Sequence, residues 1–155
     1  MIILRVVFYL FLLTPLFSQK IEITSTSMEA KNLKKEIHFI GNAKVKKNND
    51  WLHADKIIVY FNENNETKMY EAIGNVAFSF KNEKSFYKGS ASKVIYHPLL
   101  SKYILFGNAM VNDALNKREI KGNEIILNML TGNAKVKGSK QAPIKFIFEM
   151  ENTKQ

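Results

Sequence analysis

The sequence predicts an all-β fold in which imperfect repeats stack along one axis. Four copies of a repeat begin with a Gly-Asn pair, at Gly41, Gly74, Gly107 and Gly132. Around each pair, apolar and polar residues alternate with a period of two, which is the pattern of a half-buried strand. After Ser18 no window shows the i, i+3, i+4, i+7 spacing of an amphipathic helix. Short strands at roughly 8–12-residue spacing indicate a sandwich, barrel or jelly roll.

The repeat is clearest in the hexapeptide Gly-Asn-Ala-Lys-Val-Lys, which begins at Gly41 and returns unchanged at Gly132. Looser copies begin at Gly74 and Gly107, and the fourth copy comes early, which indicates a truncated last unit. Glycine tolerates positive φ, and Asn tolerates the left-handed region better than most residues. Each pair therefore permits a turn, a bulge or a kink between two apolar stretches.

The first residues predict a secretory signal peptide. Arg5 precedes an apolar run, Thr14-Pro15 ends it, and Leu16 and Ser18 form a −3/−1 pair for cleavage. The run is well short of the ~20 residues that a membrane-spanning helix needs, although a short uncleaved anchor is an alternative. We expect an exported periplasmic protein. The expected boundaries are a signal peptide helix at 1–18, a β domain at 19–150 and a flexible tail at 151–155.

Taken in order, the mature chain predicts about a dozen or more antiparallel strands. Polar turns rich in Asn, Lys and Glu separate the apolar stretches, and Pro98 ends one of them because it cannot donate to a ladder. The expected strand regions are 21–25, 27–31, 37–46, 57–61, 70–80, 94–96, 102–112, 125–127, 134–136 and 144–150. The stretches 51–56, 89–93 and 121–124 open the strands that follow them.

Composition limits the function classes. The 155 residues suffice for one domain with a real core. A net charge of +9 suggests an acidic partner such as nucleic acid, anionic lipid or an acidic glycan, unless it serves solubility alone. Cysteine is absent, so the sequence offers neither a disulfide framework nor thiol chemistry.

An ordered series of motifs resembles the OstA-like/LptA family. Gly-Asn-Ala-x-Val is followed by Ala54-Asp55-Lys56, then by Ser90-Ala91-Ser92-Lys93, and then by Lys121-Gly122-Asn123-Glu124-Ile125. The similarity covers nearly all of Ile21 to Val136. Asn123-Glu124 departs from the Asp-Lys that the family often has. Because we interpret these motifs as structural turns, the departure affects no catalytic residue.

The resemblance implies a fold and a function. The family forms an elongated, slightly twisted antiparallel β-jelly roll with an apolar interior, and copies join end to end through their terminal strands. The resulting bridge would connect inner-membrane LptC-type and outer-membrane LptD-type components. The acyl chains of lipopolysaccharide (lipid A) would pass along the interior, with no enzymatic step and no cofactor.

A carrier of acyl chains must offer continuous apolar surface, because exposing a chain of about a dozen carbons costs roughly 10 kcal/mol. Aromatic side chains at Phe78, Phe80 and Tyr96 could hold the two sheets apart. The same apolar residues would fill an ordinary sandwich core, so the two interpretations stay open. The candidate lipid-binding residues are Leu52, Ile57, Val59, Phe61, Val76, Phe78, Phe80, Val94, Tyr96, Leu105, Val111, Ile125, Leu127, Met129 and Val136.

Two further sets of residues are candidates. Lys44, Lys46, Lys135 and Lys137 could steer the anionic head group, unless they are solvated lysines of an outer face. Ile21, Ile23, Ile144, Phe146 and Phe148 belong to terminal strands, and exposed terminal strands invite strand addition from another copy. Joined head to tail, such copies form a filament. The alternative is that both termini cover their own domain.

Other functions have weaker support in the sequence. His38, His53 and His97 do not have metal-ligand spacing, and nucleophile or phosphate-loop motifs are absent. Basic charge with many aromatic residues fits an oligonucleotide-binding barrel, but the export signal argues against nucleic acid. Two alternatives remain: a membrane-anchored LptC-type component of the same pathway, and a structural β-repeat envelope protein without a lipid pocket.

Overall fold

The computed structural model describes residues 20–81 and 83–151 of the chain. The expected signal peptide and most of the expected tail therefore lie outside the described residues. Within them the chain forms ten antiparallel strands and two single-turn 3-10 helices. The elements are β1 (Glu22–Thr24), β2 (Ser27–Lys31), η1 (Asn32–Lys34), β3 (Glu36–Lys47), β4 (Asp50–Phe61), β5 (Thr67–Lys81), β6 (Phe86–His97), η2 (Pro98–Leu100), β7 (Lys102–Asp113), β8 (Arg118–Asn128), β9 (Ala134–Lys137) and β10 (Lys145–Phe148).

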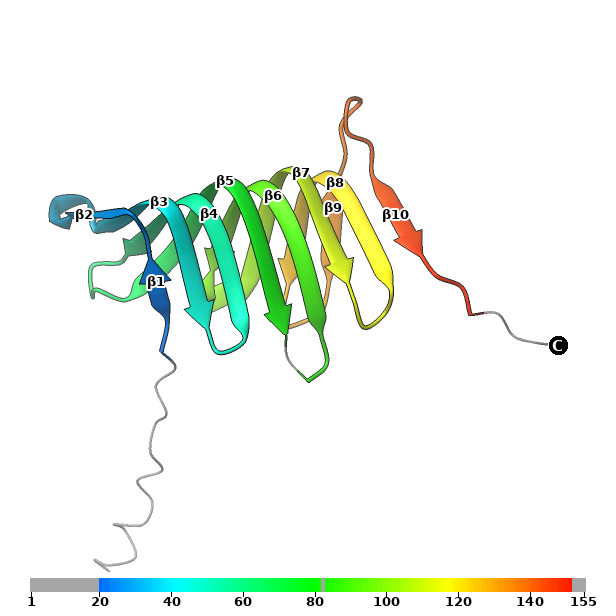
Figure 1. The fold of residues 1–155 in the computed structure, drawn as a ribbon, viewed down its shortest axis with the longest axis horizontal. Coiled ribbons are helices and arrows are strands. Elements are labelled where there is room, and N and C mark those ends of the chain that lie inside the picture. The colour runs from blue at the N-terminus through cyan, green and yellow to red at the C-terminus, as the bar shows by residue number, and fades with distance from the viewer. Residues whose placement is uncertain (1–19, 82, 152–155) are drawn as a thin grey trace, which may run out of the picture.

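The strands form one twisted sheet that is folded along its length into two layers (Figure 1). The strand order is β1-β3-β4-β5-β6-β7-β8-β10, with β2 also paired to β3 and β9 also paired to β8. β2 pairs with the first half of β3 and β1 with its second half. At the other end of the molecule, β10 pairs with the first half of β8 and β9 with its second half. This arrangement is the elongated antiparallel jelly roll that was expected.

Each layer is named here by its two edge strands. Between its edges, the β2–β9 layer contains residues 36–40, 56–61, 67–73, 93–97, 102–106 and 124–128. The β1–β10 layer contains residues 43–47, 50–54, 76–81, 86–91, 109–113 and 118–122. Every long strand therefore contributes one half to each layer.

The Gly-Asn pairs bend strands at the line where the layers meet. Gly74 and Asn75 have φ of 83° and 47°, and the pairs at Gly41 and Gly107 have the same left-handed geometry. The ladder shifts register there, so that two residues of β3 stand opposite Asp55 of β4. Such a bulge bends a strand without ending it. For this reason the described residues contain ten long or short strands rather than the expected dozen.

The partner strands accommodate the bend by changing their side-chain alternation. Ala54 and Ile57 of β4 both face the core although they are three residues apart, as do Ala91 and Val94 of β6. A regular strand would place such residues on opposite faces. The interpretation of Ala54-Asp55-Lys56 and its copies as turns was therefore wrong, because these motifs lie within continuous strands.

At the bends of β5 and β7, a side chain of the neighbouring strand packs against the bend glycine. A Cβ atom on Gly74 would collide with the Asp55 carboxylate, and one on Gly107 would lie 2.6 Å from Ser92 Oγ. Asn75 Nδ2 donates to Asp55 Oδ2 over 3.0 Å. The glycines are thus needed both for their backbone conformation and for close approach between neighbouring strands.

The fourth Gly-Asn pair has a different role. Gly132 lies in the hairpin turn between β8 and β9, where its N–H donates to the Asn128 carbonyl over 2.9 Å. A Cβ atom on Gly132 would have no neighbour within 4 Å. The identical hexapeptides at Gly41 and Gly132 therefore have different contexts, because only a few residues separate the paired residues Leu127 and Ala134.

The core lies between the layers and includes side chains from both. Val76 and Phe78 come from the β1–β10 layer, whereas Ile57, Leu105 and Ile125 come from the β2–β9 layer, and all five are fully buried. Burying each such side chain contributes about 1.5–3 kcal/mol. Phe78 lies directly over Gly89 of β6, where any side chain would collide with its ring.

Candidate functional site

An apolar groove runs between the two layers, on the side where the long strands end in hairpin turns. Its volume is ≈ 260 Å³. Both layers contribute to its walls, because Val45, Leu52 and Phe80 belong to the β1–β10 layer, whereas Tyr70, Val94 and Tyr103 belong to the β2–β9 layer. The lining residues are Ile21, Val45, Lys47, Asp50, Trp51, Leu52, Ile57, Thr67, Tyr70, Ala72, Phe80, Val94, Tyr96, Pro98 and Tyr103.

A row of aromatic rings crosses this groove. In the β2–β9 layer the Tyr70 and Tyr96 ring centroids are 6.0 Å apart, and those of Tyr96 and Tyr103 are 4.3 Å apart. The Tyr103 ring then lies 5.0 Å from the Phe80 ring, which belongs to the β1–β10 layer. Phe80 stacks in turn on Phe78 at 4.8 Å. The Phe80–Tyr103 contact therefore joins the two layers.

A second cavity of ≈ 160 Å³ adjoins the same aromatic residues. It shares Asp50, Phe80, Tyr96 and Tyr103 with the larger groove, and its other lining residues are Lys81, Ser85, Tyr87, Ser101 and Met129. The Phe80–Tyr103 contact thus lies where the two spaces meet.

The hydroxyls of Tyr96 and Tyr103 stay neutral in the groove. Burial raises the pKa of Tyr103 far above its ordinary value, and burial with the nearby Tyr70 raises the pKa of Tyr96. A neutral phenol presents an aromatic face and one hydrogen-bonding group. The centre of the groove therefore suits an apolar ligand with a polar end.

The structure divides the candidate lipid-binding residues into three groups. Leu52, Ile57, Phe80, Val94 and Tyr96 line the groove, and Met129 lines the second cavity. The second group is buried and consists of Val59, Val76, Phe78, Leu105, Val111 and Ile125. The third group, Phe61, Leu127 and Val136, is partly buried, and its last two members pack against the core.

Several groove residues were missed in the sequence. Tyr70 and Tyr103 alternate with Ala72 and Leu105 on the inward face, so the period of two already contained the signal that places them. Thr67 and Pro98 lie at strand ends, where alternation gives little information. Their place in the groove follows from the position of the turns.

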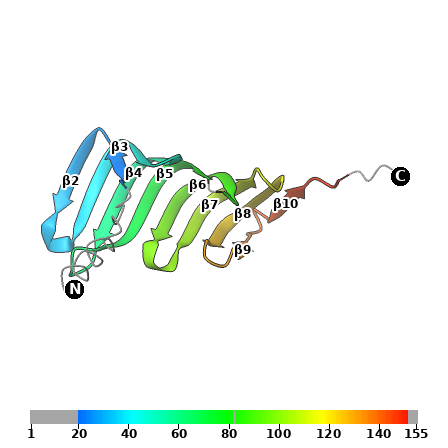
Figure 2. The same ribbon diagram turned by 90° about the horizontal axis from the view of Figure 1, so that it is seen from below.

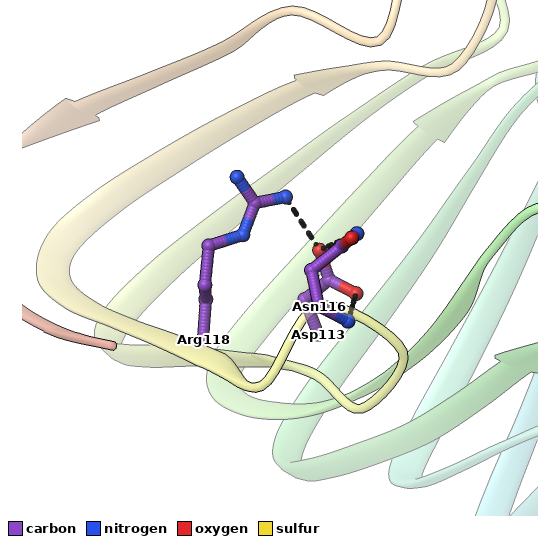
Figure 3. Close-up of polar contacts among 3 residues, drawn as sticks. All are labelled: Asp113, Asn116 and Arg118. Carbon is purple, nitrogen blue, oxygen red and sulfur yellow. Dashed lines mark hydrogen bonds and ion pairs between the residues drawn. The ribbon is translucent and has the colours of Figure 1, made fainter. Parts of the chain in front are cut away.

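Two carboxylates at the rim of the β1–β10 layer stabilise hairpins. Asp50 Oδ1 accepts a hydrogen bond from the Lys81 N–H over 2.8 Å. Asp113 Oδ2 accepts from Arg118 Nη2 over 2.7 Å and from Asn116 Nδ2 over 2.8 Å (Figure 3). Burial alone would raise the pKa of Asp113, but these hydrogen bonds outweigh it and lower the pKa below its ordinary value.

The four candidate head-group lysines do not gather at one site. Lys44 and Lys46 pair with β1, whereas Lys135 and Lys137 lie in β9 at the opposite end of the molecule and in the other layer. All four are exposed and alternate with inward-facing valines. Lys47 shares the inward alternation of Val45 and lines the groove. Which lysines contact a ligand stays a prediction.

The candidate assembly residues lie at both ends of the β1–β10 layer. Ile21 lines the groove beside β1, and Ile23 pairs with Val45 of β3. In β10, Phe146 and Phe148 remain 53% and 56% exposed. Their rings stack 5.4 Å apart. Each end therefore presents an edge strand whose outer side pairs with no other strand of residues 20–81 and 83–151.

Two of the three histidines have structural contacts on the outer faces. His38 Nε2 lies 2.7 Å from Glu36 Oε2, and this hydrogen bond lowers the pKa of Glu36. The His53 ring lies 4.6 Å from the Trp51 ring. No group of three or more metal-binding side chains is found in the part of the chain that the structure describes. That same part contains no helix long and apolar enough to cross a membrane.

Comparison with known families identifies the relationship. A family described as "LptA/(LptD N-terminal domain) LPS transport protein" matches residues 22–133. The chain belongs to this family. Membership in this LptA/LptD N-terminal family makes it a member of the lipopolysaccharide-transport proteins, as the motif series indicated.

A solved structure supports the same fold. LptH of Pseudomonas aeruginosa, the LptA-homologous periplasmic component of a lipopolysaccharide transport device, superposes with a TM-score of 0.74. The match covers 85% of this chain and 96% of LptH at 14% sequence identity, so it shows the fold alone. A comparison with curated protein sequences finds no match.

Proposed function

We propose that this chain is a periplasmic lipopolysaccharide-binding transport protein that shields lipid A acyl chains in the groove between its layers. The apolar groove is the observation that carries the proposal. Exposing an acyl chain to water costs ~0.8 kcal/mol per methylene, so a carrier needs a continuous apolar wall. Leu52, Ile57, Val94 and Tyr96 supply such a wall from both layers. Membership of the LptA/LptD N-terminal family supports the identity of the ligand.

The cargo must also move along the protein. Contacts with apolar walls have no direction, and they allow a chain to slide where buried ion pairs would hold it. The Phe80–Tyr103 contact lies in its way, because it joins the layers between the two cavities. Acyl chains therefore pass toward β8 when these two rings separate.

Anionic groups of the ligand would remain at the groove mouth. Lys47 is the lysine that lines the groove, and it lies beside Asp50 there. Lys44, Lys46, Lys135 and Lys137 act at longer range, where exposed charge is worth little but attracts anions. We therefore place head-group steering at the mouth and at the two ends of the molecule.

Head-to-tail assembly follows from the edge strands. β10 of one copy would add to β1 of the next, which would extend the β1–β10 layer across the joint. Because the two edges lie at opposite ends, the contact does not close and builds a filament. In this proposal the filament bridges inner-membrane LptC-type and outer-membrane LptD-type components.

Native mass spectrometry tests the binding of the glycolipid. The exported protein should gain the mass of lipopolysaccharide when the two are mixed. A phospholipid of similar acyl length serves as the control ligand and should be displaced by lipopolysaccharide. Failure to take up lipopolysaccharide would favour the alternative of a structural β-repeat envelope protein. An intact N-terminus on the exported protein would favour the LptC-type alternative with a retained anchor.

A further inference from the structure

The turns at one rim of the groove carry exposed leucines. Leu33 in η1 is 102% exposed, Leu99 in η2 is 86% exposed, and Leu130 between β8 and β9 is 76% exposed. Figure 2 shows these turns, in light blue, yellow-green and orange, in a row along the lower side of the view. We call Leu33, Leu99, Leu100 and Leu130 the leucine rim. Turns normally carry Gly, Asn, Asp or Ser, so leucines at three of the four turns on this side require an explanation.

The leucine rim is held outward by hydrogen-bonded turns. The Lys35 N–H donates to the Asn32 carbonyl, and the Ser101 N–H donates to the Pro98 carbonyl, each over 3.2 Å. Asn128 Oδ1 accepts from the Leu130 N–H over 3.0 Å. The Met129 N–H donates to the Ser101 carbonyl over 2.9 Å and ties two of the turns together. These bonds fix the direction in which the side chains project.

The opposite rim of the groove has a different composition. There the turns carry Asn48, Asn49, Glu83, Lys84, Asn116 and Lys117, and the exposed leucine is Leu115, which is 53% exposed. The two rims are therefore unequal, although they border the same groove. The leucine rim adjoins it directly, because Pro98 lines the larger space and Met129 lines the second cavity.

Lysines accompany the leucine rim. Lys34 and Lys35 follow Leu33, and Lys102 follows Leu99 and Leu100 in the chain. The turn at 62–66 adds Glu63 and Glu66 to this side, and Glu66 accepts a hydrogen bond from Asn62 Nδ2 over 3.0 Å. Isolated leucines with neighbouring lysines match the boundary between acyl chains and anionic head groups in a bilayer.

We propose that the leucine rim docks on the surface of a bilayer that contains anionic phospholipid. Its leucines project from three separate turns, with Leu99 and Leu100 together in η2, so they form no continuous apolar face that another protein could cover. Each leucine can insert among lipid head groups. There, burial of its apolar side chain and the attraction of nearby lysines to anionic lipid both favour membrane binding. Docking lays the long axis along the membrane and turns the groove mouth toward the lipid. A protomer docked in this way has not yet joined a filament.

Vesicle co-sedimentation tests the proposal with the exported protein. The vesicles contain equal amounts of phosphatidylcholine and phosphatidylglycerol and no lipopolysaccharide, so uptake into the groove is a separate measurement. The variant Leu33→Ser/Leu99→Ser/Leu130→Ser should lose vesicle binding by roughly tenfold or more, because exposed apolar side chains drive insertion. The matched control Leu115→Ser, on the opposite rim, should bind like the wild type.

The outcomes separate clearly. Weaker binding to pure phosphatidylcholine vesicles would support the role of the lysines. Wild-type binding by the triple variant, or absence of binding by the wild-type protein, would overturn the proposal. An equal loss in Leu115→Ser would also overturn it. Unfolding in urea, and uptake of lipopolysaccharide, should be unchanged in the triple variant, because its substituted side chains are exposed and lie outside the groove lining.

Discussion

The Phe80 ring lies 5.0 Å from the Tyr103 ring, and this contact connects the two layers of the folded sheet across the groove. Phe80 comes from the half of β5 that belongs to the β1–β10 layer, and Tyr103 comes from the start of β7 in the β2–β9 layer. Aromatic pairs at this separation contribute about 0.5–1.5 kcal/mol beyond their buried area. The contact is therefore weak enough to open when a ligand replaces it.

Fixing this contact should stop transport. The chain contains no cysteine, so Phe80→Cys/Tyr103→Cys offers two unique thiols for a short bifunctional crosslinker. We expect crosslinked protein to lose passage of lipopolysaccharide to an acceptor, because the layers can no longer part there. Transfer would be measured with labelled lipopolysaccharide. The same crosslinker on Tyr96→Cys/Tyr103→Cys, which are paired neighbours in one layer, should leave transfer intact. Equal transfer in both crosslinked proteins would refute the proposal that the Phe80 and Tyr103 rings must separate before lipopolysaccharide can pass.

Substitution of a bend glycine should destabilise the fold. Gly74→Ala forces an L-residue into φ of 83° and places its methyl group against Asp55, so it should cost more than the ~1–2 kcal/mol of the backbone term alone. Gly132→Ala should lose only the stability that the unfavourable backbone conformation costs, because nothing lies within 4 Å of its added carbon. Urea unfolding measures both. Equal losses would show that the contact with Asp55 is unimportant.

Alternation and the Gly-Asn pairs predicted most of the fold. The strand regions appear at the expected places because β5 and β7 keep one face through their bends. The bends within β4, β6 and β8 could not be recognised in the sequence, because Ala54-Asp55-Lys56 has the composition of a turn. The fourth pair, at Gly132, shows the same limit, since one hexapeptide serves both a bend and a hairpin.

The candidate site was predicted less completely. Alternation identifies inward residues such as Leu52 and Leu105, but it does not tell which of them lines the groove and which is sealed in the core. The four head-group lysines illustrate a second limit. Lys44 and Lys135 occupy the same position in two identical hexapeptides, but they lie at opposite ends of the sheet.

Acid should remove the contribution of Asp113 to stability. Its folded-state pKa is lowered, so its contribution is present above the ordinary value of 3.8 and is lost as the pH falls through the lowered pKa. Arg118 is half exposed, so we expect only about 1 kcal/mol. The stability difference between wild type and Asp113→Asn, followed by thermal unfolding, should therefore shrink as the pH falls from about 5 through the lowered pKa. A difference that is constant with pH would contradict this assignment.

Charge on the last strand should prevent assembly. Phe146→Lys/Phe148→Lys places like charges along an edge whose aromatic side chains are exposed, and lysine on an edge strand opposes strand addition. Light scattering of the wild type should show a mass that rises with concentration, whereas the variant should stay monomeric. Leu130→Ser, an exposed change at the same end in the other layer, is the control. A wild type that stays monomeric at high concentration would refute filament growth.

Photo-crosslinking from two adjacent residues tests the lipid-carrier role most directly. Leu52 lines the groove, whereas His53 is the next residue of β4 and lies on the outer face against Trp51. A photoreactive amino acid at position 52 should capture lipopolysaccharide in cells, and the same amino acid at position 53 should not. Capture at position 53 equal to that at position 52, or no capture at position 52, would contradict the proposal that acyl chains lie between the layers.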